Sequence, residues 1–296
     1  MLRIVFFTEN KWAFGTIHHS LCKLLYAQGV NAEILDFFQQ YSADEMRAIA
    51  DRTDYFVTTP VGVGWLINYG ISPQQIKSVA HAQWDLLLSI QQTGLAVYDQ
   101  LAGYAVVSNI LQQKSAEFGI TRIPVVTHVG IEFNRFYAAP SARLSAVGFA
   151  GALTSRNFAG EEIKRGNLVQ QICADLALPL RLPQYHYLAM PSYYATVDCV
   201  IQASTEEGAG LPMMEAAAAG KFVLGTPVGY FAENVTGGGI QVPVAADDFV
   251  RQCKQWIVQA RCSDHFYTMM CRQNQEYARE HYDWAKYLQD WVNFLY

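Results

Sequence analysis

The sequence predicts an α/β protein built from two doubly wound, Rossmann-like parallel sheets in tandem. Three observations support this fold class. Short, continuous apolar runs alternate with segments of helical periodicity, as expected of strands buried on both faces of a parallel sheet. The chain has 296 residues, of which 51% are hydrophobic and 16% are charged, enough for two domains with substantial cores. Residues 136–146 have no strong periodicity and divide the apolar runs into two series, so we expect the linker there.

The first series predicts six strands and one well-marked helix. The apolar runs lie at residues 2–7, 32–35, 55–58, 79–80, 104–107 and 124–126. Gly15 interrupts the chain after the first run, and residues 17–28 have the amphipathic pattern of a helix that Gly29 closes. Because strands alternate with helices, we expect right-handed βαβ crossovers.

The second series repeats this organisation. Strands are expected from residue 146, near Leu180, at 199–202 and at 222–225, and helices at 167–177 and near Tyr193. Residues 226–229 predict a turn, and residues 249–296 are mostly helical in pattern. Ligands of doubly wound sheets bind outside the carboxyl ends of the strands. We therefore expect the two domains to face a cleft, with the chemistry on the loops that follow strands.

The charge of the chain excludes one class of partner. It has 21 basic and 26 acidic residues, a net charge of −5. Residues 1–146 hold ten basic and eleven acidic residues, and the remainder holds eleven and fifteen. Neither part has the positive excess of a nucleic-acid binder. The charge gives no support to a strong electrostatic contact with a membrane, although a local basic patch remains open as a peripheral contact.

The cysteines and the apolar segments indicate where the protein works. Six cysteines are scattered without a Cys-x-x-Cys pair, which favours a reducing compartment and supports no zinc site. The apolar run at the start is too short for a signal peptide. No window has the uncharged length needed to span a bilayer. We expect a cytoplasmic protein.

The strongest chemical signal is STEEGAGLPMMEAAAAGKFVLGTPVG, residues 204–229. Glu207 follows a strand in a glycine-bearing loop, and Glu215 lies near the start of the next helix, with seven residues between the two. Paired carboxylates at the mouth of a cleft suit a ligand rich in hydroxyls, and a helix N-terminus suits a phosphate. Taken alone, the two glutamates favour the plainer interpretation of solvated residues that complement the helix dipole.

The full pattern changes this interpretation. Glu-Gly-x-Gly-Leu-Pro-x-x-Glu-Ala, followed by Ala-x-Gly-Lys and a strand, resembles the Glu-x7-Glu donor-binding signature of retaining GT-B glycosyltransferases of the family-four type. Four other stretches have weaker similarity to the family and occur in the family's order. They lie at residues 105–120, 127–136, 148–153 and 281–296. In the stretch 127–136, His128 and Glu132 are substitutions relative to the family.

The resemblance implies a GT-B fold with a particular domain organisation. Residues 1–140 would form an N-terminal Rossmann-like domain on the acceptor side. Residues 141–280 would form a C-terminal Rossmann-like domain for the nucleotide-sugar donor. Residues 281–296 would form a closing helix that returns to the N-terminal domain.

The resemblance also implies an activity. Such enzymes move a sugar from a nucleotide-diphosphate donor to a glycan or lipid-linked acceptor, with retention at the anomeric carbon, as in polysaccharide biosynthesis. The first glutamate contacts the sugar hydroxyls and the second the ribose, roles that fall to Glu207 and Glu215. Backbone N–H groups of Gly210 and Leu211 would face the sugar or the diphosphate. The family implies no cofactor and no obligatory metal, and the chain lacks the Asp-x-Asp of the metal-dependent GT-A architecture.

The diphosphate site departs from the family. Family members have Gly-Arg-Leu where this chain has Gly151-Ala152-Leu153. A leaving diphosphate needs positive charge, because negative charge grows on it in the transition state. Lys164 or Arg165, in a stretch similar to the family's Lys-Gly, is the first candidate for that charge and Arg156 the second. The alternative is that this loop is a solvated charge cluster.

Two residues of the N-terminal domain complete the expected site. His81 matches a Val-x-x-His stretch whose histidine reaches toward the donor sugar in the family; the alternative is a core histidine bonded to a backbone carbonyl. Gly15 matches a loop that contacts the phosphate or the acceptor. His18 and His19 are expected to be ordinary residues in the first turn of the following helix.

Two other function classes stay open. One is a sugar-nucleotide epimerase of the same fold. The other is a non-catalytic sugar-nucleotide-binding protein, which the missing arginine at Ala152 motivates. Turnover of the donor to free nucleotide distinguishes catalysis from binding.

Overall fold

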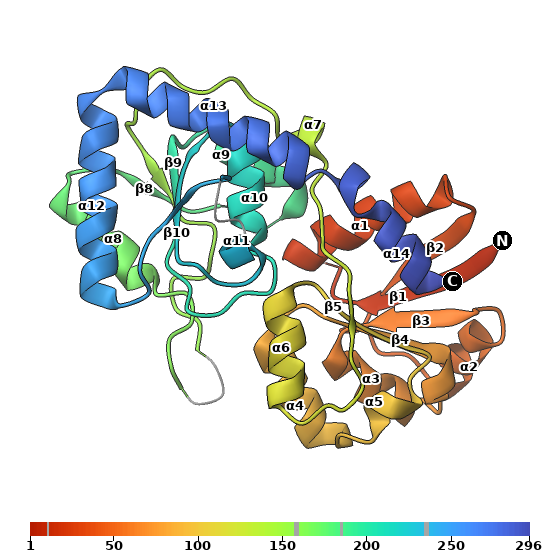
Figure 1. Ribbon diagram of the computed structural model, residues 1–296. Helices are drawn as coiled ribbons and strands as arrows, with labels where there is room; N and C mark the ends of the chain where they lie inside the picture. Colours follow the sequence, from red (N-terminus) through yellow and green to blue (C-terminus); the bar gives the residue numbers. More distant parts are fainter. Residues whose placement is uncertain (11, 157–159, 184–185, 234–236) are drawn as a thin grey trace. The chain divides into compact units, whose positions relative to one another are not determined.

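The computed structural model describes residues 1–10, 12–156, 160–183, 186–233 and 237–296, which form two compact units (Figure 1). Unit 1 comprises Met1–Val129 and Tyr287–Tyr296, and unit 2 comprises Gly130–Lys286. Each unit contains its own parallel sheet flanked by helices. The predicted α/β class with two doubly wound sheets is confirmed.

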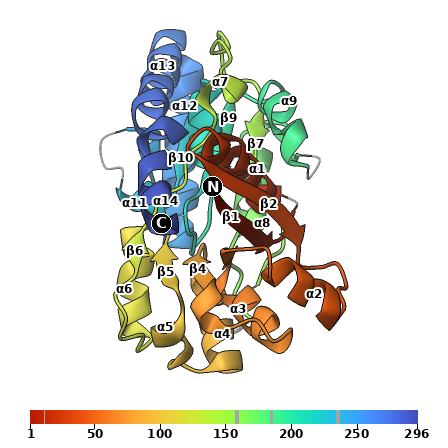
Figure 2. The ribbon, with the colours of Figure 1, turned by 90° about the vertical axis from the view of Figure 1, so that its right-hand side faces the viewer.

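Unit 1 has a six-stranded parallel sheet with the order β2-β1-β3-β4-β5-β6. Its strands β4, β5 and β6 lie next to one another in Figure 2. Its strands are β1 (Leu2–Thr8), β2 (Val30–Asp36), β3 (Tyr55–Thr58), β4 (Ile76–Ala80), β5 (Gly103–Val106) and β6 (Val125–Val126). Its helices are α1 (Trp12–Tyr26), α2 (Ala43–Ala50), α3 (Pro60–Asn68), η1 (Pro73–Gln75), α4 (Gln83–Thr93), α5 (Val97–Gln100), α6 (Asn109–Glu117) and α14 (Leu288–Leu295). The chain runs outward from β1 to β2 and then crosses back to β3. The direction in which successive strands are added to the sheet therefore reverses between β1 and β3, which is the topological switch point of this sheet.

The last helix is attached to unit 1 by a buried lysine. Lys77 lies on β4, and its Nζ donates to the backbone oxygens of Phe294 and Leu295 at 2.7 and 2.8 Å. The same ammonium lies 4.3 Å from the centre of the Tyr55 ring. Helix α14 also contacts α1, and Trp291 Nε1 donates to the backbone oxygen of His128 at 2.9 Å. The carbonyls at the end of α14, which have no partner within a helix, are thus satisfied by a cation.

Unit 2 has a five-stranded parallel sheet with the order β11-β10-β9-β7-β8. Its strands are β7 (Val147–Gly148), β8 (Leu180–Arg181), β9 (Cys199–Gln202), β10 (Phe222–Gly225) and β11 (Ile240–Gln241). Its helices are α7 (Phe133–Phe136), α8 (Gly166–Asp175), η2 (Tyr187–Ala189), α9 (Met190–Tyr194), α10 (Leu211–Ala218), α11 (Tyr230–Glu233), α12 (Ala246–Cys262), α13 (Asp264–His281) and η3 (Trp284–Lys286). The topological switch point of this sheet, where the order of successive strands reverses, lies between β7 and β9.

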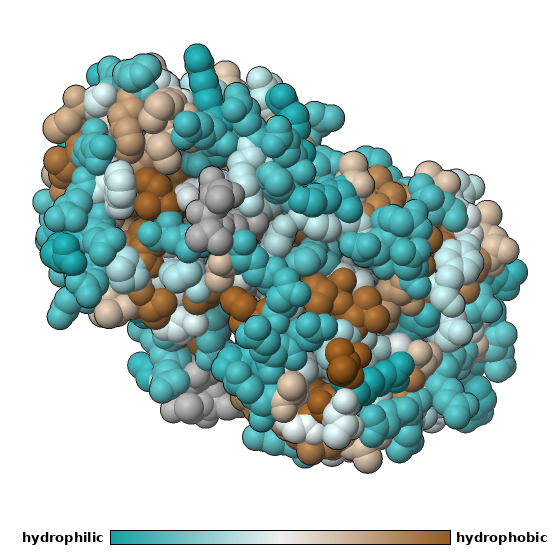
Figure 3. All heavy atoms as spheres, in the orientation of Figure 1, coloured by the Kyte–Doolittle hydropathy of each residue, from teal (hydrophilic) through white to brown (hydrophobic). Residues whose placement is uncertain are grey.

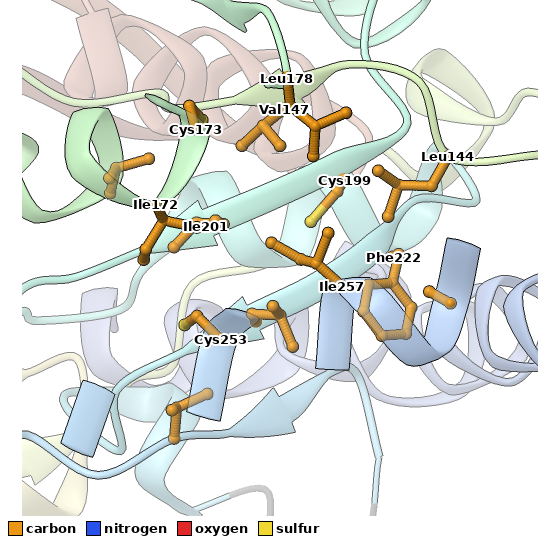
Figure 4. Close-up of a cluster of buried hydrophobic side chains, with 14 of the residues drawn as sticks. Leu144, Val147, Ile172, Cys173, Leu178, Cys199, Ile201, Phe222, Cys253 and Ile257 are labelled. Carbon is orange, nitrogen blue, oxygen red and sulfur yellow. The ribbon is translucent and has the colours of Figure 1, made fainter. Parts of the chain in front are cut away.

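One face of this sheet packs on a cluster of apolar side chains (Figure 4). Val147, Cys199 and Phe222 extend from three neighbouring strands into it, and Ile172 and Ile257 reach it from α8 and α12. All five side chains are fully buried. This packing fixes the strands whose ends form the candidate site.

The strands follow the sequence predictions closely, but the start of the first helix does not. Residues 55–58, 199–202 and 222–225 are strands with the expected bounds. Helix α1 begins at Trp12 rather than at residue 17. Gly15 therefore lies inside the first turn of α1 and not in a loop, which corrects the position expected for it. His18 is consequently in the body of the helix, where it is 3% exposed.

The boundary between the units falls before the expected linker. The backbone N–H of Ile131 donates to the carbonyl of Tyr282 at 2.8 Å, and Trp284 N–H donates back to Ile131 at 3.1 Å. A Cβ on Gly130 would lie 2.8 Å from backbone atoms of Trp284, so only glycine permits this approach. These contacts attach the segment after Val129 to the end of unit 2.

The surface is mixed in character. The face seen in Figure 3 carries mostly hydrophilic residues, with hydrophobic ones in smaller groups between them. Such scattered apolar residues are normal for a folded chain. No helix within the described ranges is both long enough and apolar enough to cross a membrane.

Candidate active site

The carboxyl ends of β7 and β9 border a small pocket in unit 2. It is lined by Phe149, Ala150, Gly151, Lys164, Ile201, Gln202, Ser204, Glu207 and Pro212. Three of these directly follow β7, Lys164 lies in the loop before α8, four are the last two residues of β9 and residues after it, and Pro212 is in the first turn of α10. The pocket thus lies where the sheet changes direction, which is where open α/β sheets bind ligands.

Glu207 is held in this pocket by two neighbours. Lys164 Nζ forms an ion pair with Glu207 Oε1, and the hydroxyl of Ser204 donates to the same oxygen at 2.7 Å. The side chains of Lys164 and Glu207 are 29% and 14% exposed. The structure thus brings together two of the predicted site residues, one of each charge, at a place that a ligand can reach.

Backbone hydrogen bonds join the two loops that carry this pair. The N–H of Thr205 donates to the carbonyl of Ile163 at 2.9 Å, and the N–H of Ile163 donates to the carbonyl of Ser155 at 2.7 Å. A Cβ on Gly166 would lie 2.8 Å from the backbone of Leu153, which explains a glycine after Lys164 and Arg165. The lysine is therefore positioned by the fold of its loop as well as by its ion pair.

The turn predicted at residues 226–229 supports the glutamate loop from the other side. Thr226 donates its hydroxyl to the carbonyl of Ser204, and the N–H of Tyr230 donates to Gly208 at 2.9 Å. A Cβ on Gly229 would lie 2.7 Å from the carbonyl oxygen of Gly208. The residues around Glu207 are thus fixed on both sides.

Arg165 faces protein carbonyls. Its Nε donates to the carbonyl of Ala203 at 2.5 Å, its Nη1 donates to that of Val244, and its guanidinium lies 5.4 Å from the Phe249 ring. Arg165 also has a left-handed backbone, with φ of 48°. Arg165 does not belong to the described lining of the pocket. The two candidates that the sequence could not separate are therefore placed differently.

Arg156 is engaged within its own loop. Its Nη1 donates to the carbonyl of Gly160 at 2.8 Å, and its backbone pairs with Glu162 in an antiparallel bridge. It is also outside the described lining of the pocket. The structure thus joins only Lys164, of the three cations considered for the diphosphate, to Glu207.

Glu215 lies in α10 and is 3% exposed. The hydroxyl of Tyr194 donates to its Oε2 at 2.8 Å. Burial raises the pKa of Glu215 to about 7, against the opposing effects of the Tyr194 hydrogen bond and the Arg135 charge. The sequence predicts paired carboxylates at the mouth of a cleft, but only Glu207 belongs to the described pocket lining, whereas Glu215 is buried. The helical turn after Pro212 directs Glu215 toward α9.

The start of α10 has the backbone geometry that the sequence suggested. Gly210 precedes the helix with φ of 77°, a left-handed conformation that glycine adopts without strain. Leu211 is the first helical residue and is followed by Pro212. The first N–H groups of a helix have no partner within it. Those of Gly210 and Leu211 therefore stay candidates for contact with a ligand beside the pocket.

His81 lies in unit 1, directly after β4. Its ring is 5.1 Å from the Phe14 ring and 5.9 Å from the His18 ring. Loss of water around it lowers the pKa of His81 to about 3. At neutral pH it is an uncharged imidazole, which can donate and accept hydrogen bonds but brings no positive charge. Gly15 follows Phe14 in α1 and is thus near this group of rings in sequence.

Some polar groups at the site were not singled out from the sequence. Tyr194 and Arg135 act on Glu215 from positions distant in the chain, and no local pattern marks them. Gln202 ends the otherwise apolar strand Cys-Val-Ile-Gln, and a polar residue at the carboxyl end of a buried strand is a signal that could have found it. Within the described ranges, no group of three or more His, Cys, Asp or Glu is placed to hold a metal ion.

Comparison with known proteins adds a family match over part of the chain and a fold. Residues 144–259, which include the whole pocket, match the family model described as "Glycosyl transferases group 1". The structure as a whole has the GT-B fold of glycosyltransferases, as its structural neighbours show. No curated protein matches the sequence.

Three solved structures illustrate the likeness. HepE from Anabaena, in complex with UDP-glucose, is 14% identical with a TM-score of 0.68, over 100% of this chain and 99% of that one. Sucrose-phosphate synthase from Thermosynechococcus elongatus is 13% identical with a TM-score of 0.72, over 99% and 98%. The catalytic domain of starch synthase IV from Arabidopsis thaliana, bound to ADP and acarbose, is 11% identical with a TM-score of 0.73, over 99% and 98%. At these identities the likeness establishes the fold and nothing finer.

Proposed function

We propose that this protein is a retaining glycosyltransferase that transfers a sugar from a nucleotide-diphosphate sugar to a glycan or lipid-linked acceptor. The family match over residues 144–259 and the GT-B fold support the general class. The observation that carries the proposal is the Lys164–Glu207 pair in the pocket where the sheet of unit 2 changes direction. It offers an acceptor for sugar hydroxyls and a cation for a phosphate in one place.

Each group has a proposed task. Glu207 accepts hydrogen bonds from hydroxyls of the transferred sugar, and Lys164 compensates the charge of the diphosphate. The N–H groups of Gly210 and Leu211 bind phosphate or sugar oxygens at the start of α10. Glu215, the fifth residue of that helix, accepts from the ribose. His81 serves the donor sugar from unit 1 as a neutral hydrogen-bonding group.

The reaction proposed is transfer on one face of the sugar. The bond between the anomeric carbon and the diphosphate oxygen breaks, and the electron pair stays on the diphosphate. The acceptor oxygen forms its bond on the same face, and its proton passes to the departing phosphate oxygen. The Lys164 ammonium stabilises the diphosphate most strongly in the transition state, because the negative charge on the diphosphate is greatest there. Neither a metal nor a cofactor is required by this scheme.

A second candidate is a non-catalytic protein that binds sugar nucleotides. The observation that favours it is Ala152, which brings no charge to the place where an arginine was expected, while Lys164 is already paired with Glu207. Under this alternative, the pocket binds the donor and no product forms.

One experiment separates these candidates. The melting temperature is measured with UDP-glucose, UDP-N-acetylglucosamine, ADP-glucose and GDP-mannose, because a specific ligand stabilises the folded state by mass action. Release of free nucleoside diphosphate is then followed with the stabilising donor. Stabilisation with turnover supports the transferase, and stabilisation without turnover, tested with glycan and lipid-linked acceptors, supports the binding protein. NMR of the product determines whether the anomeric configuration is retained.

A further inference from the structure

The end of β9 carries a buried polar side chain that has no partner. Gln202 is 5% exposed, and neither its Nε2 nor its Oε1 has a hydrogen-bond partner among the described residues. Its backbone is satisfied, since the N–H of Thr226 donates to its carbonyl at 3.1 Å. Burial of polar groups without hydrogen bonds is costly, so such a side chain calls for a functional explanation.

The side chain of Gln202 belongs to the pocket. It lines the pocket together with Lys164, Ser204 and Glu207. Strand residues alternate between faces, and Cys199 and Ile201 contribute to the apolar cluster, so Gln202 extends to the other side. A Cβ on Gly210 would lie 3.4 Å from both Nε2 and Oε1 of Gln202. The amide therefore lies beneath the start of α10, beside the ion pair.

The chemistry of the amide limits what it can bind. Nε2 carries two donors, and Oε1 is an acceptor. Phosphate oxygens only accept, so a diphosphate would satisfy Nε2 and leave Oε1 against a negative charge. Hydroxyls both donate and accept, and two neighbouring hydroxyls satisfy both atoms of the amide. The neighbouring Glu207 carboxylate is also an acceptor suited to hydroxyls.

We propose that Gln202 is a specificity-determining residue that binds two neighbouring hydroxyls of the transferred sugar. Nε2 donates to one hydroxyl, and Oε1 accepts from the other. This inference rests on the proposed function and extends it to the recognition of the sugar. A donor that lacks one of the two hydroxyls leaves one amide atom unpaired, and sites built in this way reject such analogues strongly.

The test uses the full chain with the substitution Gln202→Leu. Calorimetry measures the Kd of the nucleotide sugar that most stabilises the wild type, and of the matching nucleoside diphosphate. We expect the Kd of the nucleotide sugar to rise about 10- to 100-fold, as for loss of one or two buried hydrogen bonds. The Kd of the nucleoside diphosphate should change less than about threefold. For a deoxy donor that lacks one of the two hydroxyls, the ratio of the Kd of the variant to that of the wild type should be smaller than for the parent donor.

A matched control has the same substitution at another buried amide. Gln275 is 7% exposed, but its Nε2 donates to Ala138 and Ala218 carbonyls at 2.8 Å each. Gln275→Leu should lower the melting temperature and leave both Kd values within about threefold. Gln202→Leu should keep or raise the melting temperature of the free protein, because it removes an unpaired amide. If Gln202→Leu does not fold, Gln202→Met, which has a similar length and neither the donors nor the amide oxygen, replaces it with the same expectation.

The outcomes separate the inference from the proposed function. Wild-type affinity of Gln202→Leu for the nucleotide sugar overturns the inference and leaves the transferase proposal intact. Equal weakening of nucleotide sugar and nucleoside diphosphate also overturns it, because the amide would then serve the nucleotide or the fold. If the wild type binds none of the four nucleotide sugars, the proposed function fails and this inference fails with it.

Discussion

Glu207 is the residue on which the proposed chemistry depends most. It is the acceptor in the pocket that Lys164 and Ser204 hold in place. We predict that Glu207→Ala lowers kcat/KM about 30- to 1000-fold, equivalent to about 2–4 kcal/mol, through loss of a strong hydrogen bond to the sugar in the transition state. Donor turnover and circular dichroism measure activity and folding. Glu206→Ala is the control, and activity of Glu207→Ala within threefold of wild type would contradict the assignment.

Substitutions of the two adjacent cations, Lys164 and Arg165, should have different effects. Lys164 pairs with Glu207 in the pocket, whereas Arg165 donates to Ala203 and Val244. We predict that Lys164→Ala lowers donor affinity and lowers turnover further, since its charge matters more in the transition state. Arg165→Ala should instead lower the melting temperature. Arg156→Ala should affect activity least.

Calorimetry and turnover with donor, nucleoside diphosphate and nucleoside monophosphate measure these effects. The monophosphate should respond least, because it brings the least charge to Lys164. Unchanged affinity and turnover in both Lys164→Ala and Arg165→Ala would put the phosphate site elsewhere. Unchanged affinity and turnover in Arg156→Ala as well would exclude all three of these cations from the phosphate site.

The buried carboxyl of Glu215 predicts a pH effect on stability. Its pKa is raised to about 7 from 4.5, so the folded state holds a proton that the unfolded state releases. The folded state therefore loses stability as the pH rises from about 4.5 through 7, by about 3 kcal/mol at most. Glu215→Gln removes this loss. We expect its unfolding free energy, relative to wild type, to increase between pH 5 and pH 8 in urea titrations; a constant difference would refute the shift.

At the level of elements, the start of α10 should be sensitive to a single methyl group. Gly210 has φ of 77°, and alanine in this conformation costs about 1–2 kcal/mol. Gly70 is a matched control, with φ of 86° and no atom within 4 Å of an added Cβ. We predict that both alanine variants lower the melting temperature, but that only Gly210→Ala weakens donor binding, by tenfold or more. Equal donor affinity in the two variants would exclude α10 from the site.

The elements themselves were predictable because their signals are local. Buried strands such as residues 199–202 appear as apolar runs, and the pattern around Glu207 is contiguous. The first turn of α1 was missed because Gly15 suggested a break that the helix tolerates. The Lys164–Glu207 pair joins residues 43 apart, and Tyr194–Glu215 joins residues 21 apart. Such pairs depend on how the strands are ordered, which the periodicity of the sequence does not contain.

At the level of the whole molecule, the proposed reaction predicts independence from metal ions. In the proposed reaction, Lys164 and the N–H groups of α10 compensate the charge of the diphosphate, as a cation would in a metal-dependent site. We predict that transfer continues at an unchanged rate in excess EDTA. The measurement compares initial rates of nucleotide release before and after chelation. Complete inhibition that magnesium reverses would contradict a metal-independent mechanism.

The path of the chain through the two units has a consequence for its synthesis. Unit 2 is one continuous stretch, Gly130–Lys286, inserted into unit 1, whose last part is Tyr287–Tyr296. Because a ribosome makes the chain from its N-terminus, unit 2 has all its residues before unit 1 does. The hydrogen bonds from Lys77 to the carbonyls of Phe294 and Leu295 can form only after more than half of the chain has been synthesised beyond Lys77. A nascent chain that stalls between residues 286 and 294 therefore carries all the residues of unit 2 but only part of unit 1.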